Sequence, residues 1–288
     1  MNVTTVGVIG GSGLYELPGL AEVKSVRLTT PFGDPSDEFV CGTLNGVRMV
    51  FLPRHGRGHR ILPSELNFRA NIYGMKQLGV EYLVAVGAVG SMRLEVAPGQ
   101  VVVPDQFIDR TSKRPSTFFG NGVVAHVMFA DPCCAVLMRA VAEASRAVGA
   151  TVHEGGAYLC MEGPQFSTRA ESEMYRSWGA TVIGMTNLQE AKLAREAELC
   201  FATMALVTDY DCWNPHHDDV TIEDVLRVLN ANVALARAVV ADTVPRLPAA
   251  RTCACGSALK NAIITDPARI PAQVREDLRL IIGKYVGA

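Results

Sequence analysis

The sequence predicts an α/β fold, a single domain with a central mixed β-sheet flanked by helices. Short apolar runs rich in β-branched residues alternate with segments that carry helix-capping signals. Hydrophobic residues make up 49% of the chain and charged residues 19%, a composition that excludes a disordered protein. A chain of 288 residues can build one large core, so we expect one domain over residues 1–288, with a C-terminal tail from about residue 246.

The strands of this sheet are predicted from their apolar runs. Runs of this length bounded by turn residues are typical of strands that are covered on both faces. In chain order they are residues 3–9, 48–52, 81–86, 100–103, 181–184 and 201–207.

Helices are predicted between several of these runs, from their capping signals. Ser64 is a candidate N-cap for a helix that runs through Gln77 and stops at Gly79. The spacing Thr168-x-x-Glu171 is a capping box, and its helix is expected to end near Gly179. Similar signals, Asn187-x-x-Glu190 and Thr221-x-x-Asp224, open two more helices.

Two carboxylates, Asp209 and Asp211, lie one residue apart just beyond the run 201–207. In extended backbone alternate side chains share a face, so both can converge on one ligand. Two acids in a poorly hydrated pocket cannot both ionise freely, and the one with the raised pKa can donate a hydrogen bond. This suits a purine, whose N7 takes a proton while its exocyclic amine donates to the second carboxylate. The alternative interpretation is a pair of solvated loop acids.

Three segments at the ends of apolar runs are candidates for anion binding. The glycine turn at residues 10–13 exposes backbone N–H groups and the Ser12 hydroxyl, although a tight turn without a ligand explains it equally well. It is not a dinucleotide fingerprint, because Glu16 stands at the third glycine position. Arg54 and His55 follow the run 48–52 and can donate to phosphate oxygens, and the small residues 87–91 again offer backbone N–H groups.

Phe166 and Ser167 precede the capping box at Thr168 and are candidates for contact with a flat base, although Phe166 is equally plausible as core packing. A formal net charge of −2 and a pI near 6.3 argue against a nucleic-acid or anionic-membrane partner. Without a signal-like segment or a membrane-length apolar run, the chain is expected to be cytoplasmic. The eight cysteines lack zinc-ribbon spacing, so we expect no metal, and we expect Cys253 and Cys255 to be free thiols.

Taken together, these motifs resemble the 5′-methylthioadenosine phosphorylase family, within the trimeric purine nucleoside phosphorylase superfamily. The resemblance covers roughly residues 6–242, with motifs in matching order. It rests on residues 10–14, 30–36, 54–57, 67–71, 105–111, 162–166, 184–186 and 208–213.

The resemblance implies a nucleoside phosphorylase-like fold and a pentosyltransferase that converts 5′-methylthioadenosine and phosphate into adenine and 5-methylthioribose 1-phosphate, a step of methionine and purine salvage. It implies no cofactor, since inorganic phosphate is a co-substrate, and a homotrimer or a dimer of trimers. A broader adenosine or purine nucleoside phosphorylase, a hydrolytic nucleosidase and a non-catalytic purine-binding protein remain the alternatives.

Site roles follow from the same resemblance. Asp209 and Asp211 would be catalytic and read the base. Phosphate would be held by Ser12, Arg54, His55, the Ala88 N–H and Thr186; Met185 would contact the ribose, and Phe166 and Ser167 the base. The pocket for the 5′ substituent would be formed by His126 from a neighbouring subunit, Ile222 and Val225. The chain departs from the family at Gly87, where many relatives have threonine, at Gly184, usually asparagine, and at Gln189, usually proline.

Overall fold

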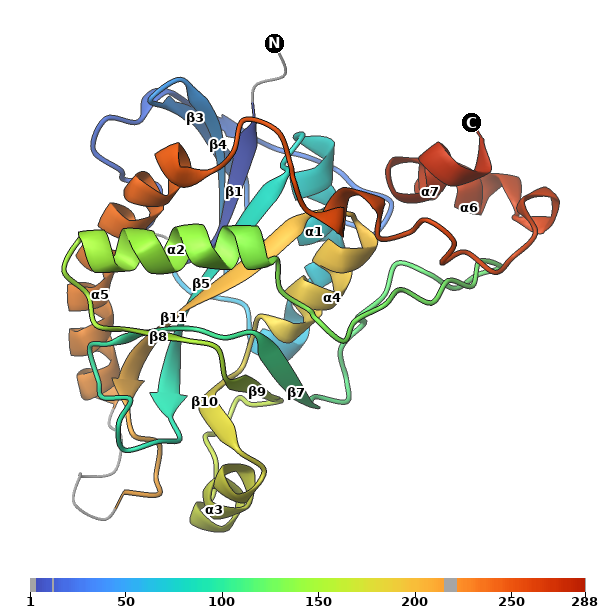
Figure 1. The fold of residues 1–288 in the computed structure, drawn as a ribbon. Helices are drawn as coiled ribbons and strands as arrows, with labels where there is room; N and C mark the ends of the chain where they lie inside the picture. The colour runs from blue at the N-terminus through green and yellow to red at the C-terminus, as the bar shows by residue number, and fades with distance from the viewer. Residues whose placement is uncertain (1–3, 12, 215–221, 288) are drawn as a thin grey trace.

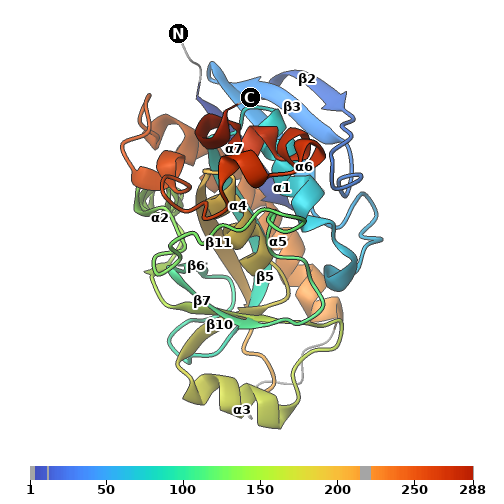
Figure 2. The same cartoon turned by 90° about the vertical axis from the view of Figure 1, so that its right-hand side faces the viewer.

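The protein is built on one mixed sheet, seen from two sides in Figures 1 and 2. The computed structural model describes residues 4–11, 13–214 and 222–287, with the backbone alone for residues 222–231. Its strands are β1 (Thr5–Gly10), β2 (Ala21–Val26), β3 (Phe39–Leu44), β4 (Val47–Pro53), β5 (Tyr82–Ser91), β6 (Val101–Val103), β7 (Gln106–Arg110), β8 (Val152–Glu154), β9 (Ala157–Met161), β10 (Ala180–Gly184) and β11 (Cys200–Asp209). The main order is β2-β3-β4-β1-β5-β10-β9-β7, and β11 pairs with β5 and β6 off this path.

Helices cover both faces of the sheet (Figure 1). They are α1 (Phe68–Gln77), α2 (Ala135–Ala147), α3 (Arg169–Ser177), α4 (Leu188–Glu196), α5 (Ile222–Thr243), α6 (Ala272–Asp277) and α7 (Arg279–Val286), with short 3₁₀ turns at Pro63–Glu65, Val244–Arg246, Ala254–Ser257 and Pro267–Arg269. α2 and α5 pack together on one face, and α1 and α4 on the other, each pair over its own apolar cluster. The predicted fold class is confirmed.

β5 and β11 form the longest pairing of the sheet, and they run parallel with Tyr82 opposite Cys200 and Val89 opposite Val207. The run 81–86 was predicted to end in a loop, but the strand continues through residues 87–91, where it also pairs antiparallel with β10. Asp209 is the last residue of β11, so this strand carries it to the carboxyl edge of the sheet. α2 and the strands β2, β3, β7, β8 and β9 were not predicted.

The capping signals had mixed outcomes. The capping box at Thr168 and Glu171 is confirmed, with the Thr168 side chain accepting from the Glu171 N–H. The Ser64 prediction was wrong, because Asn67 caps α1 by accepting from the Ala70 N–H. Asn187 stands at the N-cap of α4 but makes no capping hydrogen bond. Thr221, the proposed cap of α5, lies outside the described residues.

The C-terminal residues after 246 are not a loose tail. Residues 258–287, together with residues 115–130, form a lobe, here called the arm, which projects from the body on the right of Figure 1. The two parts are joined by a bridge between Ala125 and Ile263 and by the His126 N–H, which donates to the Ala262 carbonyl at 2.9 Å. Buried Ile281 and Ile282 pack into the core cluster that includes α1 and α4. None of the helices described is long and apolar enough to cross a bilayer.

Candidate active site

A cavity of about 940 Å³ opens at the carboxyl edge of the sheet. This volume lies in the range of small-molecule sites. Its walls come from the ends of β1, β4, β5, β10 and β11 and from α5, and they include most of the residues predicted to bind substrate: Arg54, His55, Ala88, Phe166, Met185, Thr186, Asp209 and Asp211.

The two acids lie next to each other in the wall of this cavity. Both oxygens of the Asp209 carboxylate accept hydrogen bonds, one from the Thr208 hydroxyl at 2.6 Å and one from the Asp211 N–H at 2.8 Å. Asp211 accepts from the Ser172 hydroxyl at 2.5 Å. Burial raises the pKa of both carboxyls despite these donors, and the charge of Asp209 raises the pKa of Asp211 further.

The acids converge for a different reason than predicted. Alternation along a strand does not apply, because Asp211 lies beyond β11 with a positive φ of 52°. The turn folds Asp211 back so that its N–H reaches Asp209. Gly90 leaves the space for this arrangement, since a β-carbon there would lie 2.9 Å from an Asp209 carboxylate oxygen.

Hydrogen-bond donors gather around Gly87. A β-carbon placed at residue 87 would lie 3.6 Å from Asn187 Nδ2 and 3.8 Å from both Arg54 Nη1 and Thr186 Oγ1. The absence of a side chain at Gly87 therefore opens a space lined by an amide, a guanidinium and a hydroxyl. Asn187 Nδ2 is buried without a hydrogen-bond partner among the described residues, an arrangement that costs free energy unless a ligand accepts from it.

Arg54 is held more tightly than the sequence suggests. Its guanidinium is buried and binds Glu190 through Nε at 2.5 Å and Nη2 at 3.0 Å, while Nη2 also donates to Asn187 Oδ1 and to the Ile9 carbonyl. Nη1 donates to the Val86 carbonyl at 2.8 Å, its one hydrogen bond within the described chain. Arg54 therefore keeps a single N–H for a ligand, because Glu190 occupies the pair of donors formed by Nε and Nη2.

His55 is neutral in this environment. Its Nδ1 lies 2.8 Å from the Ile61 carbonyl, which can only accept, so Nδ1 carries the ring proton. Burial and then the charge of Arg54 lower the pKa of His55 to about 4. At neutral pH Nε2 is thus an acceptor, whereas the sequence reasoning treated His55 as a donor.

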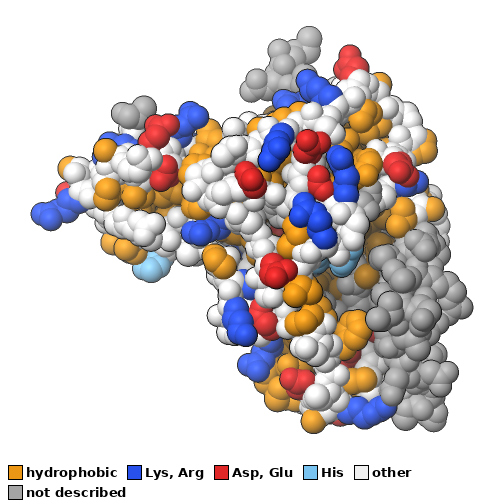
Figure 3. Space-filling view, turned by 180° about the vertical axis from the view of Figure 1, so that it is seen from behind, with side chains coloured by type: hydrophobic (Ala, Val, Ile, Leu, Met, Phe, Trp, Pro, Cys, Tyr) orange, Lys and Arg blue, Asp and Glu red, His pale blue; other side chains and the backbone are white. Residues whose placement is uncertain are grey.

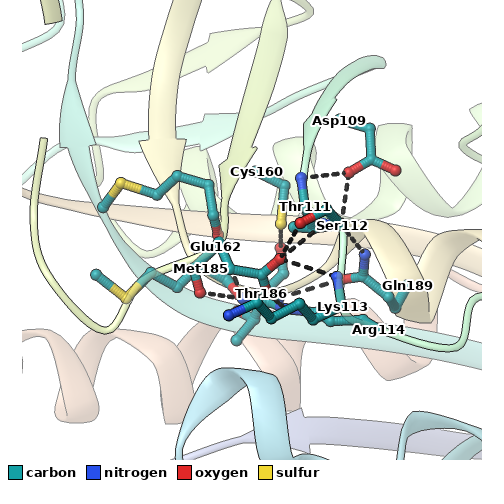
Figure 4. A network of polar contacts seen from close by, with 11 residues as sticks. Asp109, Thr111, Ser112, Lys113, Arg114, Cys160, Glu162, Met185, Thr186 and Gln189 are labelled. Atoms are coloured by element: carbon teal, nitrogen blue, oxygen red, sulfur yellow. Dashed lines mark hydrogen bonds and ion pairs between the residues drawn. The ribbon is translucent and has the colours of Figure 1, made fainter. Parts of the chain in front are cut away.

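A second buried arginine, Arg114, fixes the backbone of Met185, which lines the cavity (Figure 4). Arg114 donates to the Met185 carbonyl at 2.5 Å, to Glu162 Oε1 at 2.8 Å and to Gln189 Oε1 at 3.2 Å. Gln189 also donates to the Thr111 hydroxyl at 2.7 Å. Gln189, which stands where relatives usually have proline, therefore links Arg114 to Thr111 and helps to fix the backbone of Met185.

The departure at Gly184 is explained by Tyr158. A β-carbon at residue 184 would lie 2.0 Å from the Tyr158 hydroxyl oxygen, so the phenol fills the space that a side chain at 184 would need. Tyr158 is fully buried, and its hydroxyl has no hydrogen-bond partner among the described residues.

The remaining residues predicted for the site either do not line the cavity or lie outside the described residues. Ser167 is not among the described residues that line the cavity, and its hydroxyl lies 3.6 Å from Met161 Sδ. His126 lies on the arm, and it too is absent from the described cavity wall. Ser12 and the side chains of Ile222 and Val225 lie outside the described residues, although the neighbours Gly11 and Gly13 line the cavity.

Several residues of the site were missed by sequence reasoning. Asn187 and Glu190 were interpreted as a helix cap, but they bind Arg54. Ser172 and Thr208 donate to the acid pair, and Arg114 lies in a segment without a recognised motif. One signal could have predicted the ion pair of Glu190. It is a charged residue three positions into a buried helix, and a buried carboxylate requires a cationic partner.

Comparison with known proteins identifies the family. A model described as the phosphorylase superfamily matches residues 5–245. S-methyl-5′-thioadenosine phosphorylase of Geobacter sulfurreducens is 62% identical over 282 residues, covering 98% of this chain and 99% of the relative. The protein of the same name from Thermosynechococcus vestitus is 57% identical over 285 residues, covering 98% and 99%.

Solved structures agree with these relatives. A methylthioadenosine phosphorylase from an antarctic soil metagenomic library has a TM-score of 0.93 at 44% identity and covers 98% of this chain and 99% of its own. The methylthioadenosine phosphorylase from Schistosoma mansoni in complex with adenine has a TM-score of 0.83 at 33% identity, covering 97% and 98%. The resemblance predicted from the motifs is confirmed, and the chain belongs to the S-methyl-5′-thioadenosine phosphorylase family of the phosphorylase superfamily.

Proposed function

We propose that the protein catalyses phosphorolysis of 5′-methylthioadenosine, which yields adenine and 5-methylthioribose 1-phosphate. The observation that carries this proposal is one cavity whose wall contains a buried acid pair beside Gly90 and hydrogen-bond donors beside Gly87. Gly90 beside the acids and Gly87 beside the donors are three residues apart on β5, about 10 Å along a strand. This separation leaves room for one ribose between a base and a phosphate.

The acid pair serves the leaving base. Cleavage of the glycosidic bond places negative charge on adenine, and a carboxyl that keeps its proton can transfer it to N7. We assign this role to Asp209 and acceptance from the 6-amino group to Asp211. Burial raises the pKa of both carboxyls, which favours the protonated form that this role needs.

The donors around Gly87 serve the nucleophile. Thr186, Asn187 and Arg54 Nη1 surround the space, and Ala88 follows on the same strand. Since Glu190 already neutralises Arg54, phosphate would be held mostly by neutral donors aimed at it. Bound there, phosphate faces the ribosyl carbon, stabilises its developing positive charge and attacks it. No step of this reaction calls for a cofactor.

The 5′ pocket is proposed to be completed by a second subunit. His126 lies on the arm, which shows apolar side chains at its surface (Figure 3). Among them, Met128 is 88% exposed and Ile264 is 65% exposed. An arm of this kind suits a homotrimer, alone or as a dimer of trimers, in which His126 reaches a neighbour's cavity near Ile222 and Val225. A cytoplasmic location remains a proposal that rests on the sequence.

The test is a product assay with and without phosphate. Purified protein should release adenine from 5′-methylthioadenosine only when phosphate is present, with 5-methylthioribose 1-phosphate as the second product. Thr186→Val should raise the phosphate KM about tenfold by removing one donor to an anion. Thr151→Val, at an exposed threonine just before β8, is the control. Release of free methylthioribose without phosphate would identify a hydrolase, and adenine binding without turnover would identify a non-catalytic purine-binding protein.

A further inference from the structure

Four cysteine thiols from three separate segments come together far from the cavity. All four sulfur atoms lie within 4.8 Å of one another, and the Sγ atoms of Cys200 and Cys253 are 3.3 Å apart. Three of the side chains are buried, and that of Cys253 is half-buried. This group, here called the thiol cluster, consists of Cys134, Cys200, Cys253 and Cys255.

The backbone holds the thiol cluster in place independently of the sulfur atoms. The Cys134 N–H donates to the Phe201 carbonyl at 2.8 Å, and the Cys200 N–H to the Glu81 carbonyl at 2.9 Å. Arg251, just before the third segment, donates to the Glu198 carbonyl at 2.8 Å. The four ligand positions are therefore preorganised by the sheet and its neighbouring segments.

We propose that the thiol cluster binds one Zn²⁺ ion as a closed, structural tetrathiolate site. Zinc prefers four sulfur ligands in a tetrahedron at about 2.3 Å, which places neighbouring sulfurs about 3.8 Å apart. The cluster is already compact enough that small shifts of the side chains reach this geometry. On binding, each thiol releases its proton, so four Zn–S bonds replace four S–H bonds and the site carries a net charge of −2.

Two neighbouring groups suit that negative charge. Tyr82 is opposite Cys200 in the β5–β11 register, is fully buried and has a hydroxyl without a hydrogen-bond partner among the described residues. A thiolate ligand would accept from this hydroxyl, as second-sphere donors commonly do in metal sites. Cys134 is also the N-cap of α2, a helix of 13 residues whose positive dipole end favours an anionic ligand.

The position of the site indicates a structural role. Cys200 begins β11 and Asp209 ends it, which puts the thiol cluster about 30 Å from the acid pair along the strand. All four positions of a tetrahedral ion would be taken by protein, leaving none for substrate. The ion would fasten the segment at residues 253–255 to the sheet and to α2. Sequence spacing argued against zinc because the ligands come from three distant segments, and only Cys253 and Cys255 are close in the chain.

The test is the metal content of the full-length protein, purified under reducing conditions with zinc supplied. We expect elemental mass spectrometry to detect one zinc ion per chain. Replacement by Co²⁺ should give the intense sulfur-to-cobalt charge-transfer absorption and the visible bands of a tetrahedral thiolate site. Removal of zinc should lower Tm by about 5–10 °C while leaving kcat at a moderate assay temperature unchanged.

Variants separate the thiol cluster from its surroundings. Cys253→Ser should lose the zinc and the cobalt charge-transfer band, whereas Cys133→Ala, at the buried neighbour of Cys134 outside the cluster, should retain both. Tyr82→Phe should keep the fold and weaken zinc affinity about tenfold. Metal-free wild-type protein that neither takes up Zn²⁺ nor shows the cobalt spectrum overturns the proposal, whether its eight thiols are all reduced or some are paired as disulfides.

Discussion

At Asp209, burial and hydrogen bonding act on the pKa in opposite directions. Two donors, the Thr208 hydroxyl and the Asp211 N–H, favour the ionised carboxylate, whereas removal from water favours the protonated form and prevails. The same balance holds at Asp211, where the Ser172 hydroxyl opposes burial and the nearby charge of Asp209. Burial therefore favours the protonated form of both carboxyls relative to solvated loop acids.

Asp209→Asn should reduce kcat by about 10²–10⁴ and change the nucleoside KM little, because the amide keeps the shape but has no proton to transfer. In the wild type, kcat should fall as pH rises through the raised pKa of the pair, since the acid then loses its proton. Steady-state kinetics with saturating phosphate measures both effects. Asp131→Asn, at an exposed aspartate, is the control, and undiminished turnover in Asp209→Asn would remove the general-acid assignment.

The pair should also select the base. A carboxylate accepts from the 6-amino group of adenine, whereas the 6-oxo group of hypoxanthine sets an acceptor against an acceptor, at a cost of about 1–3 kcal/mol. We expect kcat/KM for 5′-methylthioadenosine to exceed that for 5′-methylthioinosine by at least about tenfold. Equal values for the two nucleosides would show that Asp209 and Asp211 do not read position 6.

His55 should contribute a neutral hydrogen-bond acceptor to phosphate binding. With its pKa lowered to about 4, the ring stays neutral in the assay range, and Nε2 accepts a hydrogen bond from a phosphate hydroxyl, which both the monoanion and the dianion carry. His55→Ala should therefore raise the phosphate KM about tenfold, by a similar factor across the assay range. A variant whose phosphate KM equals that of the wild type would contradict the role of Nε2 as an acceptor.

At the scale of elements, local signals were reliable where a residue acts within its own helix and failed where it acts across the fold. Thr168 and Glu171 cap α3 as their spacing predicts, because both partners lie within one turn. The same spacing at Asn187 and Glu190 predicted the start of α4 correctly, but both side chains bind Arg54 instead of capping the helix. The buried arginine is a stronger partner for Glu190 than a helix N-terminus is.

The packing of Gly184 in β10 against Tyr158 in β9 can be tested by substitution. Gly184→Ala should destabilise the protein by about 1–3 kcal/mol, because the new methyl group meets the Tyr158 hydroxyl in a packed core. Tyr158→Leu should recover part of that loss in the double variant. Gly283→Ala, a helical site in α7 with open space around it, is the control and should be neutral or stabilising. Chemical denaturation measures all four proteins, and a stable Gly184→Ala variant would contradict the packing argument.

At the scale of the whole molecule, the role proposed for the arm is to connect assembly with substrate choice. Met128→Glu places a charge on an exposed apolar position of the arm and should reduce the proposed trimer or hexamer to smaller species in light scattering. The kcat/KM for 5′-methylthioadenosine should fall with it, since His126 no longer reaches a neighbouring cavity. Val23→Glu, an exposed apolar position on β2, is the control. A wild-type protein that is monomeric and fully active would refute the role of the arm.

The sequence by itself determined the fold class, the family and most of the cavity wall. Periodicity and capping are local properties, and the motifs at the ends of apolar runs converge because parallel strands end at one edge of a sheet. Tertiary structure decided which partner each polar side chain takes. It paired Arg54 with Glu190, fixed the tautomer of His55 and placed the Asn187 amide beside the space at Gly87. It also assembled the thiol cluster from three segments, because contacts between residues far apart in the chain depend on packing that no local spacing records.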